Sequence, residues 1–430
     1  MSTDEARATK SARPGRFAAP RGTDDVLPEE WRWWRYVRDT AERVCERFGY
    51  RRIETPVFEH AGVYLRTAGA GTDIVEKEVY VFRDRGDDLL ALRPEGTAGV
   101  VRAYIEHGMA SLPQPVRLYY IAPNFRYDRP QAGRYRQHTQ LGIEAIGDPH
   151  PLLDAETIDV LRTFFDTLGI GEYTVKLNTI GDASCRPAYV EALRAYYRPH
   201  LDTVCADCRV RFEKNPLRLL DCKEERCQPV IAGAPRLHEY LCDACREHFA
   251  LLRTYLDALG IAYVIDERLV RGLDYYTRTV FEFHPLVEGA QSSMGSGGRY
   301  DGLVELLGGP ATPGVGFGTG FERLILNLQR QGLDLGPPPA PDVFIAHLTP
   351  DAATVALRLA GHLRAAGLEA IVGPAGRSLK AQMRAADARG ARYAAILGEQ
   401  ELAAGEVTLR DLGTREERRV SQAEVPGAVR

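Results

Sequence analysis

Three consecutive prolines in the segment GPPPAP, at 336–341, divide this chain of 430 residues into two parts of unequal length. Proline fixes its own backbone angle and lacks an amide hydrogen, so this composition predicts a linker over 334–341. After the linker, strand-like runs such as DVFIAHL and YAAILG alternate with helical periods. This alternation predicts an α/β domain with a mixed sheet over 342–430.

The longer part, before the linker, contains three kinds of segment. Residues 1–16 have no periodic apolar pattern, which predicts a mobile N-terminal tail. A core is expected over 17–182 and 256–333, where short apolar runs such as EVYVFRD and LLALRPEG flank turn signals and predict hairpins. Between these ranges, 183–255 is rich in arginine and cysteine and is predicted to be a helical or irregular insertion.

The overall charge is not that of a nucleic-acid-binding protein that is basic throughout. Fifty-five basic and 59 acidic residues give a net charge of −4, so any RNA or phosphate site must be a local patch. No apolar run reaches about 18 residues, the length that a membrane-spanning helix needs. The first 25 residues lack the apolar centre of a signal peptide, and we therefore expect a cytoplasmic protein with no membrane partner.

Arginines gather around the loop of one predicted hairpin, in FRYDRPQAGRYRQ. Four guanidinium groups on one hairpin repel each other unless anions lie among them, which indicates nucleotide phosphates or an RNA backbone. A solvated hairpin would show the same composition, so this segment alone leaves both interpretations open. The four residues are Arg126, Arg129, Arg134 and Arg136.

Polar residues alternate along the strand that follows. With a period of two, Gln140, Gly142 and Glu144 share one face, and Gly142 leaves a gap between two polar side chains. Such a face suits a small cationic or hydrogen-bonding ligand, although a surface strand can show the same pattern. Earlier in the chain, LRPEGT places Glu95 and Thr97 at a predicted helix start, where they either cap the helix or bind a substrate ammonium group.

Two further segments are dense in polar residues or in glycine. In RGLDYYTRT, Arg271, Tyr275 and Tyr276 lie around a turn at Gly272, a density that favours a functional role. In GVGFGTGFERLIL, glycines alternate along one strand face before a helix that begins near Arg323. A strand face without side chains allows a planar ring to lie flat on the backbone, with the arginine placed to stack on it or to hold a phosphate.

Taken in this order, the segments resemble the three motifs of the class II aminoacyl-tRNA synthetases. The extended segment near 52–60 is similar to motif 1, FRYDRPQAGRYRQ within 120–144 to motif 2, and GVGFGTGFERLIL within 314–326 to motif 3. LVRGLDYYTRTVFEF and LRPEGTAG narrow the resemblance to the histidyl-tRNA synthetase family, and it extends over nearly the whole chain.

This resemblance implies a fold and an activity. The fold is an α+β catalytic domain on a mostly antiparallel sheet of about six or seven strands, with the helical insertion and a C-terminal α/β anticodon-binding domain. The activity joins L-histidine and ATP into histidyl-adenylate and transfers histidine to the 3′ end of tRNA(His), releasing AMP and diphosphate. The resemblance further implies Mg²⁺ bound with ATP, and a homodimer formed through motif 1.

The resemblance also implies roles for individual residues. Three arginines are expected to be catalytic and to bind ATP together with two glycines: Arg126, Arg271 and Arg323, with Gly318 and Gly320. Histidine is expected to contact Glu95, Gly96, Thr97, Gln140, Glu144, Tyr275 and Tyr276. The acceptor stem of the tRNA would meet Arg129, Gln131 and Arg134. In the C-terminal domain, a solvated helix face or phosphate contacts would equally explain Arg377, Lys380, Arg384 and Arg389.

A non-catalytic relative is the alternative function. Synthetase-like regulatory subunits of histidine biosynthesis bind histidine without charging tRNA, and they lack both the anticodon-binding domain and the catalytic residues. Because this chain has the C-terminal domain as well as Arg126, Arg271 and Arg323, the sequence favours the enzyme.

Six of the eight cysteines lie between 205 and 245. Two C-x-x-C pairs, Cys205 with Cys208 and Cys242 with Cys245, have the spacing of a structural zinc site. Disulfides are a poorer explanation in a cytoplasmic enzyme. Reduced thiols that pack as small apolar groups are the alternative, and the family resemblance does not support a metal.

Overall fold

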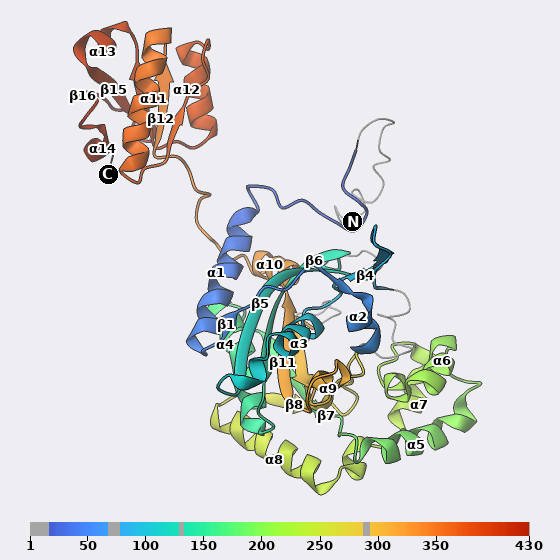
Figure 1. The fold of residues 1–430 in the computed structure, drawn as a ribbon. Helices are drawn as coiled ribbons and strands as arrows, with labels where there is room; N and C mark the ends of the chain where they lie inside the picture. The colour runs from blue at the N-terminus through green and yellow to red at the C-terminus, as the bar shows by residue number, and fades with distance from the viewer. Residues whose placement is uncertain (1–16, 68–77, 129–132, 287–292, 430) are drawn as a thin grey trace. The chain divides into compact units, whose positions relative to one another are not determined.

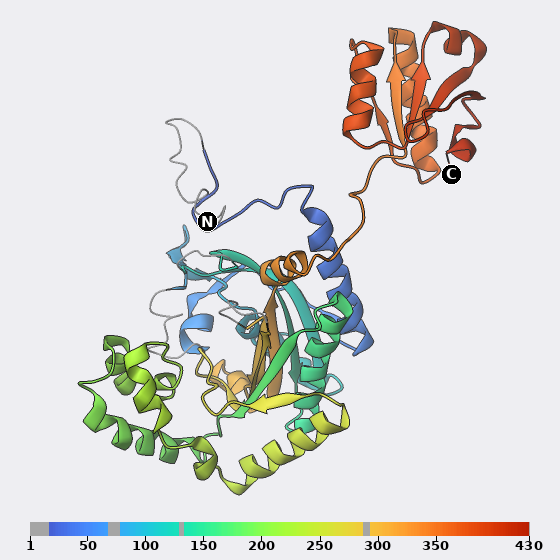
Figure 2. The same ribbon diagram turned by 180° about the vertical axis from the view of Figure 1, so that it is seen from behind.

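The computed structural model describes residues 17–67, 78–128, 133–286 and 293–429. The chain forms two compact units, Met1–Leu335 and Gly336–Arg430 (Figures 1 and 2). The predicted tail at 1–16 and the middle of the predicted arginine loop, 129–132, lie outside the described residues.

The first unit is built on a large sheet with the strand order β1-β5-β6-β11-β10-β9-β7-β8. In that order the strands are β1 (Arg51–Arg52), β5 (Val116–Phe125), β6 (Gln137–Ile146), β11 (Gly314–Gly320), β10 (Gly295–Arg299), β9 (Thr277–Pro285), β7 (Tyr173–Thr179) and β8 (Tyr263–Ile265). The six inner strands pair antiparallel, whereas β1 pairs parallel with β5 and β8 pairs parallel with β7. The mostly antiparallel sheet is therefore confirmed, and its eight strands exceed the expected six or seven because two short edge strands extend it.

Four helices cover one face of this sheet and form the main core with it. They are α1 (Trp31–Arg47), α4 (Pro151–Leu168), α8 (Asp243–Ala258) and α10 (Phe321–Arg330). The sequence sets the ends of α4 locally, because His150 caps it, Pro151 opens it, and Gly169 ends it in the left-handed conformation at φ 84°. The core of this face is therefore built from helices that lie far apart in the sequence (Figure 1).

The opposite face of the sheet carries a second, smaller sheet and three short helices. A second sheet in the order β2-β4-β3 lies beside α2 and α3, and α9 packs on α3. These elements are β2 (Phe58–His60), β4 (Leu89–Leu92), β3 (Val81–Arg83), α2 (Ala61–Thr67), α3 (Thr97–Glu106) and α9 (Leu303–Leu306). A separate apolar cluster joins α3 and α9 to the large sheet, so the start of α3 is fixed against β5 and β6.

The insertion between β7 and β8 has a small core of its own. Its helices are α5 (Arg186–Tyr197), α6 (Ala206–Lys214) and α7 (Gln228–Ala232), connected by short 3₁₀ turns, and α8 returns the chain to the large sheet (Figure 2). Six cysteines belong to the buried cluster that holds these short elements together.

The second unit is an α/β domain with a mixed sheet, as the sequence predicts. The strand order is β13-β12-β14-β15-β16, in which the first three strands are parallel and the last two are antiparallel. Its elements are β12 (Val343–His347), α11 (Pro350–Ala365), β13 (Ala370–Val372), α12 (Leu379–Ala388), β14 (Tyr393–Leu397), α13 (Glu399–Ala404), β15 (Glu406–Asp411), β16 (Glu417–Ser421) and α14 (Val425–Ala428).

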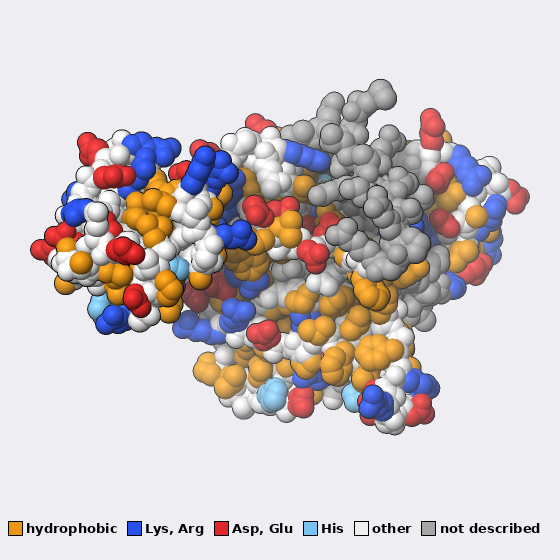
Figure 3. Space-filling model, turned by 90° about the horizontal axis from the view of Figure 1, so that it is seen from above, with side chains coloured by type: hydrophobic (Ala, Val, Ile, Leu, Met, Phe, Trp, Pro, Cys, Tyr) orange, Lys and Arg blue, Asp and Glu red, His pale blue; other side chains and the backbone are white. Residues whose placement is uncertain are grey.

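Charge is mixed over the surface. On the face drawn in Figure 3, Lys and Arg side chains are interspersed with Asp and Glu side chains, in keeping with the net charge of −4. Among the described residues, no helix combines the length and the apolar character that crossing a bilayer requires. In the second unit, the side chains of Arg377, Lys380, Arg384 and Arg389 are exposed on and around α12.

Candidate active site

A cavity of about 580 Å³ opens on the large sheet where α3 begins. Most of the residues that the sequence singled out line it: Glu95, Thr97, Arg126, Arg134, Gln140, Arg271, Tyr275, Tyr276, Gly318, Gly320 and Arg323. Two further predicted residues, Glu144 and Gly96, are not part of the lining. Glu144 is completely buried beside it, and Gly96 lies so close to the ring of Tyr120 that a Cβ atom would not fit. Arg129 and Gln131 lie outside the described residues. The fold therefore gathers segments from five parts of the chain around one pocket.

Glu95 acts on the helix start and also lines the pocket. Its two carboxylate oxygens accept the backbone N–H groups of Thr97, at 2.6 Å, and Ala98, at 2.9 Å. Burial raises the pKa of Glu95 in spite of these bonds. A carboxylate has about four acceptor positions, so Glu95 can still bind a cationic ligand while it caps α3. Capping and ligand binding, which the sequence left as alternatives, are thus compatible.

Glu144 is buried behind the pocket wall and bonds to three residues that line the pocket. Its carboxylate accepts the hydroxyl of Thr97 at 2.7 Å, that of Tyr300 at 2.5 Å and that of Tyr120 at 3.4 Å. Because burial penalises the charged form, the pKa of Glu144 is raised to about 8. Sequence reasoning missed both tyrosines. Tyr120 stands directly opposite Gly142 in the β5–β6 register, a relationship that only the strand pairing reveals.

The glycines of β11 and β6 make space for neighbouring side chains. A Cβ atom at Gly316 would lie 2.3 Å from Oε2 of Glu144, and one at Gly318 would lie 1.9 Å from Nε2 of Gln140. At Gly142 a Cβ atom would lie 2.1 Å from the ring of Tyr120. The sequence interpretation of an empty gap and a bare strand face therefore needs correction, because side chains from β5 and β6 fill most of this space.

Three arginines converge on another part of the pocket. Arg126 donates from Nε to the carbonyl of Pro94 at 2.8 Å, and Arg323 donates to the carbonyls of Gly133, at 3.0 Å, and Ser293, at 2.8 Å. Burial and the charges of Arg134 and Arg126 lower the pKa of Arg323. The positive potential that this implies is the environment that a phosphate group requires.

The electrostatics of His138 agree with this description. Burial and the charges of Arg126 and Arg323 lower the pKa of His138 to about 3. The imidazole of His138 is therefore neutral at physiological pH and adds no charge to the arginine cluster.

Arg271 is held by an acidic partner that the sequence did not predict. It forms an ion pair with Glu282 and donates to Oγ of Ser296 at 2.7 Å, while its guanidinium group lies 5.3 Å from the centre of the Tyr276 ring. His284 contacts the other carboxylate oxygen of Glu282 at 2.8 Å. Glu282 alternates with apolar residues in the strand TVFEFHP, and this alternation is the sequence signal that its side chain leaves the core.

The cysteines form two groups that differ from the expected set. Cys205 and Cys208 lie with Cys222 and Cys227, whereas Cys242 and Cys245 lie with Asp182 and Cys185. The expectation that both C-x-x-C pairs, Cys205 with Cys208 and Cys242 with Cys245, share one site is therefore wrong. The other two members of the first group, Cys222 and Cys227, are separated by four residues rather than two, so the C-x-x-C spacing did not select them.

Comparison with solved structures identifies the class. The structure matches the apo histidyl-tRNA synthetase of S. aureus with a TM-score of 0.81 and 36% sequence identity, covering 96% of this chain and 100% of that chain. The large, mostly antiparallel sheet is accordingly that of a class II aminoacyl-tRNA synthetase.

Sequence comparisons identify the family within that class. The family model described as histidyl-tRNA synthetase matches residues 22–324, and the model described as anticodon binding domain matches residues 342–430. A protein of Dehalococcoides mccartyi named histidine–tRNA ligase is 52% identical over 410 residues, which are 95% of this chain and 97% of that protein. The chain belongs to the histidyl-tRNA synthetase family.

A more distant likeness concerns the regulatory alternative. A Bacillus halodurans structure, described as an ATP phosphoribosyltransferase regulatory subunit/histidyl-tRNA synthetase, matches with a TM-score of 0.62 and 23% identity. It covers 87% of this chain and 97% of that chain. At this identity the likeness shows a shared fold alone.

Proposed function

We propose that this chain is a histidine–tRNA ligase. It converts L-histidine and ATP to histidyl-adenylate and diphosphate, and then transfers the histidyl group to the 3′ end of tRNA(His) with release of AMP. The observation that carries the proposal is a single pocket that combines buried carboxylates and tyrosines with a cluster of arginines. The first set suits an amino acid with a polar ring, and the second suits a nucleotide phosphate.

The amino acid would bind at the carboxylates. Glu95, Thr97 and Gln140 hold its α-ammonium group, since a buried carboxylate with neighbouring polar groups offers strong charge-assisted hydrogen bonds to a cation. Glu144 and Tyr276 contact the two ring nitrogens of the imidazole, with Tyr275 beside them. An analogue without these nitrogens would lose its hydrogen bonds to Glu144 and Tyr276, and sites built to bond a substrate N–H or O–H reject such analogues by about four to five orders of magnitude.

ATP would bind at the arginines. Arg126 contacts the α-phosphate and Arg323 contacts the adenine or the γ-phosphate, with the backbone of Gly318 and Gly320 alongside. The carboxylate of histidine attacks the α-phosphorus, its oxygen forms the new P–O bond, and diphosphate leaves. This nucleophile is already ionised, so the protein must supply in-line positioning and charge neutralisation rather than a general base. Arg271 stabilises the negative charge that develops on the α-phosphate.

Magnesium accompanies ATP in enzymes of this class. Mg²⁺ takes oxygen ligands and usually binds through one or two carboxylates together with substrate phosphates. Glu282 supplies a carboxylate in the pocket beside Arg271, and binding of the ion would replace its contact with Arg271 or with His284. Bound Mg²⁺ would neutralise phosphate charge during the displacement.

The remaining contacts would serve tRNA and assembly. Arg134, with Arg129 and Gln131 of the same sequence motif, contacts the acceptor stem, and the unit Gly336–Arg430 binds the anticodon. The segment near 52–60 is the proposed interface of a homodimer, and the proposed location is the cytoplasm. In the second unit, the exposed Arg377, Lys380, Arg384 and Arg389 are available for phosphate contacts.

The regulatory alternative is less well supported. Such a subunit would need the histidine pocket but neither the arginine cluster nor the anticodon-binding unit, and this chain has both. The test is aminoacylation of tRNA(His) with radiolabelled histidine in the presence of Mg²⁺ and ATP. Label in acid-precipitable tRNA(His), with little in tRNA for another amino acid, is the expected result. Histidine binding without any charging would favour the regulatory function.

A further inference from the structure

Four cysteines of the insertion bring their sulfur atoms into one buried group: Cys205, Cys208, Cys222 and Cys227. Their side chains are between 0% and 5% exposed, and their Sγ atoms all lie within 4.8 Å of one another. The Sγ atoms of Cys205 and Cys222 are 3.7 Å apart. This is far beyond a disulfide bond of about 2.05 Å, so the four residues are free thiols packed against each other.

The spacing of the sulfur atoms matches a tetrahedral metal site. Zinc binds cysteine sulfur at about 2.3 Å, and four sulfur atoms at the corners of a tetrahedron of that radius lie about 3.8 Å apart. The Cys205–Cys222 separation of 3.7 Å is close to this edge length. Apolar packing alone does not require four thiol groups to lie together, whereas metal binding does.

Backbone hydrogen bonds in the group point to thiolates. The N–H of Cys208 donates to Sγ of Cys205 at 3.3 Å, and the N–H of Cys205 donates to Sγ of Cys227 at 3.3 Å. Sulfur is a weak acceptor as a thiol, and these bonds gain strength when it carries a negative charge. Gln228 donates to the carbonyl of Cys222 at 2.7 Å, which fixes the loop that carries the third sulfur.

The insertion also has the size at which a metal contributes most to stability. Its elements are short, with nine residues in α6 and five in α7. Below about 70–80 residues a single apolar core rarely supplies more than about 3–5 kcal/mol, and a structural metal is one of the ways in which small domains add stability. Six of the seventeen buried residues in its core are cysteines, beside leucine, valine and aromatic residues.

We propose that Cys205, Cys208, Cys222 and Cys227 bind one structural Zn²⁺ ion as thiolates. The four thiols release their protons to solvent on binding, since the thiolate is the ligand form. The inference does not depend on the proposed function. It is confined to this group because, in the other one, Oδ2 of Asp182 already accepts a hydrogen bond from Arg278 at 3.1 Å.

The metal site would also shape the rim of the active pocket. Asp221 and Lys223, on either side of one ligand, line the active cavity. Cys222 itself lines an adjoining cavity of about 720 Å³ that shares Arg126 and Arg271 with it. Zinc would therefore hold a wall of the substrate site as well as the insertion core.

The experiment measures metal in the full-length chain. Wild type and variants are saturated with Zn²⁺, freed of excess metal by gel filtration and analysed by mass spectrometry. The variant Cys208→Ser is expected to hold about one zinc ion per chain less than wild type. Cys45→Ala is the matched control, because Cys45 is buried in α1 outside both groups, and it should hold as much zinc as wild type.

Because Cys208→Ser could lose zinc through misfolding alone, a second measurement uses the wild-type chain. Wild-type chain in which Co²⁺ replaces Zn²⁺ should show the intense visible bands of a tetrahedral cobalt–thiolate centre. Retention of all zinc in Cys208→Ser, or a wild-type chain that binds neither ion, would overturn the proposal. The proposal would also be overturned if Cys242→Ser lost zinc while Cys208→Ser kept it, because the metal would then lie in the group that contains Asp182.

Discussion

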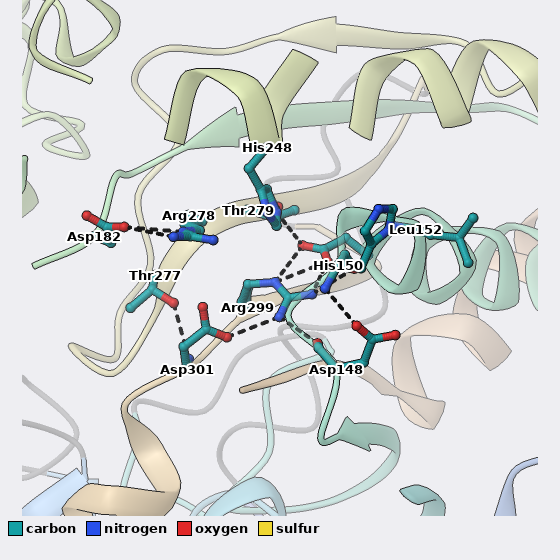
Figure 4. Close-up of polar contacts among 11 residues, drawn as sticks. Asp148, His150, Leu152, Asp182, His248, Thr277, Arg278, Thr279, Arg299 and Asp301 are labelled. Atoms are coloured by element: carbon teal, nitrogen blue, oxygen red, sulfur yellow. Dashed lines mark hydrogen bonds and ion pairs between the residues drawn. The ribbon is translucent and has the colours of Figure 1, made fainter. Parts of the chain in front are cut away.

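Asp154 and Arg299 form an ion pair in which both side chains are completely buried, where α4 packs against β10. Figure 4 shows the contact of Arg299 with Asp301 in the same network. Nε of Arg299 lies 3.1 Å from each carboxylate oxygen of Asp154, and His248 contacts Oδ1 at 3.3 Å. Burial alone would raise the pKa of Asp154, but the charge of Arg299 and the hydrogen bond from His248 outweigh it and lower the pKa to about 2. Arg299 also binds Asp301, whose N–H donates to Thr277, the residue after the pocket tyrosines.

This network predicts a large loss of stability when one partner is removed. Arg299→Met should destabilise the unit Met1–Leu335 by about 3–5 kcal/mol, because the carboxylate of Asp154 would stay buried without its partner. Urea unfolding followed by circular dichroism measures the change. Arg83→Met is the control, since the Arg83–Asp87 pair is exposed and should change the unfolding free energy by about 1 kcal/mol at most. Equal effects of the two substitutions would contradict the network's role.

Gly318 of β11 predicts a contrast with a glycine outside the pocket. Gly318→Ala should lower kcat/KM for histidine by about 10- to 100-fold, because the new Cβ would displace the amide of Gln140 from the histidine site. Gly302→Ala, where a new Cβ would meet no atom within 4 Å and which does not line the pocket, should change it by less than about threefold. The measurement is histidine-dependent ATP–diphosphate exchange. Similar values for both variants would show that Gln140 does not position the substrate.

The raised pKa of Glu144 predicts a pH dependence for histidine. In the empty pocket this pKa is about 8, so the carboxylate that should accept the imidazole N–H is mostly protonated at pH 7. We expect kcat/KM for histidine to rise about five- to tenfold between pH 7 and pH 8.5 as Glu144 ionises. Glu144→Gln has no group to titrate and should lose this rise together with most of the activity. A flat wild-type profile over this range would argue against Glu144 as the acceptor.

The proposed role of Arg271 predicts that its removal slows adenylate formation much more than it weakens the binding of ATP and histidine. Arg271→Ala should slow adenylate formation by at least about 100-fold, because charge on the α-phosphate would lose its stabilising partner. Binding of ATP and histidine, measured by calorimetric titration, should change only a few-fold. Arg330→Ala, an exposed position in the last turn of α10, serves as the control. Near-normal exchange in Arg271→Ala would remove this residue from the catalytic role.

Much of the fold followed from local patterns. The linker prolines, the strand and helix alternation after them, and the hairpin signals each act over a few residues, and the sequence carries such information directly. The edge strands β1 and β8 were harder to predict because they have two and three residues and depend on parallel partners far along the chain. Their pairing with β5 and β7 is a property of the assembled sheet.

The residues of the site that lie on one strand could be predicted from the sequence, but their partners on other strands could not. Gln140 and Glu144 share one strand face as the period of two requires; Gln140 lines the pocket, and Glu144 accepts a hydrogen bond from Thr97, which also lines it. The partners that set their environment come from other strands. Tyr120 reaches Glu144 only through the β5–β6 register, and Glu282 meets Arg271 across a turn. The same limit explains why the cysteine spacing suggested a set of ligands that the fold divides between two groups.

The most direct test of the proposed function is amino-acid-dependent exchange between ATP and diphosphate, measured with each of the twenty amino acids in Mg²⁺ and without tRNA. This reaction reports adenylate formation and amino acid selection together. The proposal predicts rapid exchange with histidine and background exchange with the other nineteen. No exchange with any amino acid, in a folded chain that binds histidine, would contradict it and favour the regulatory function.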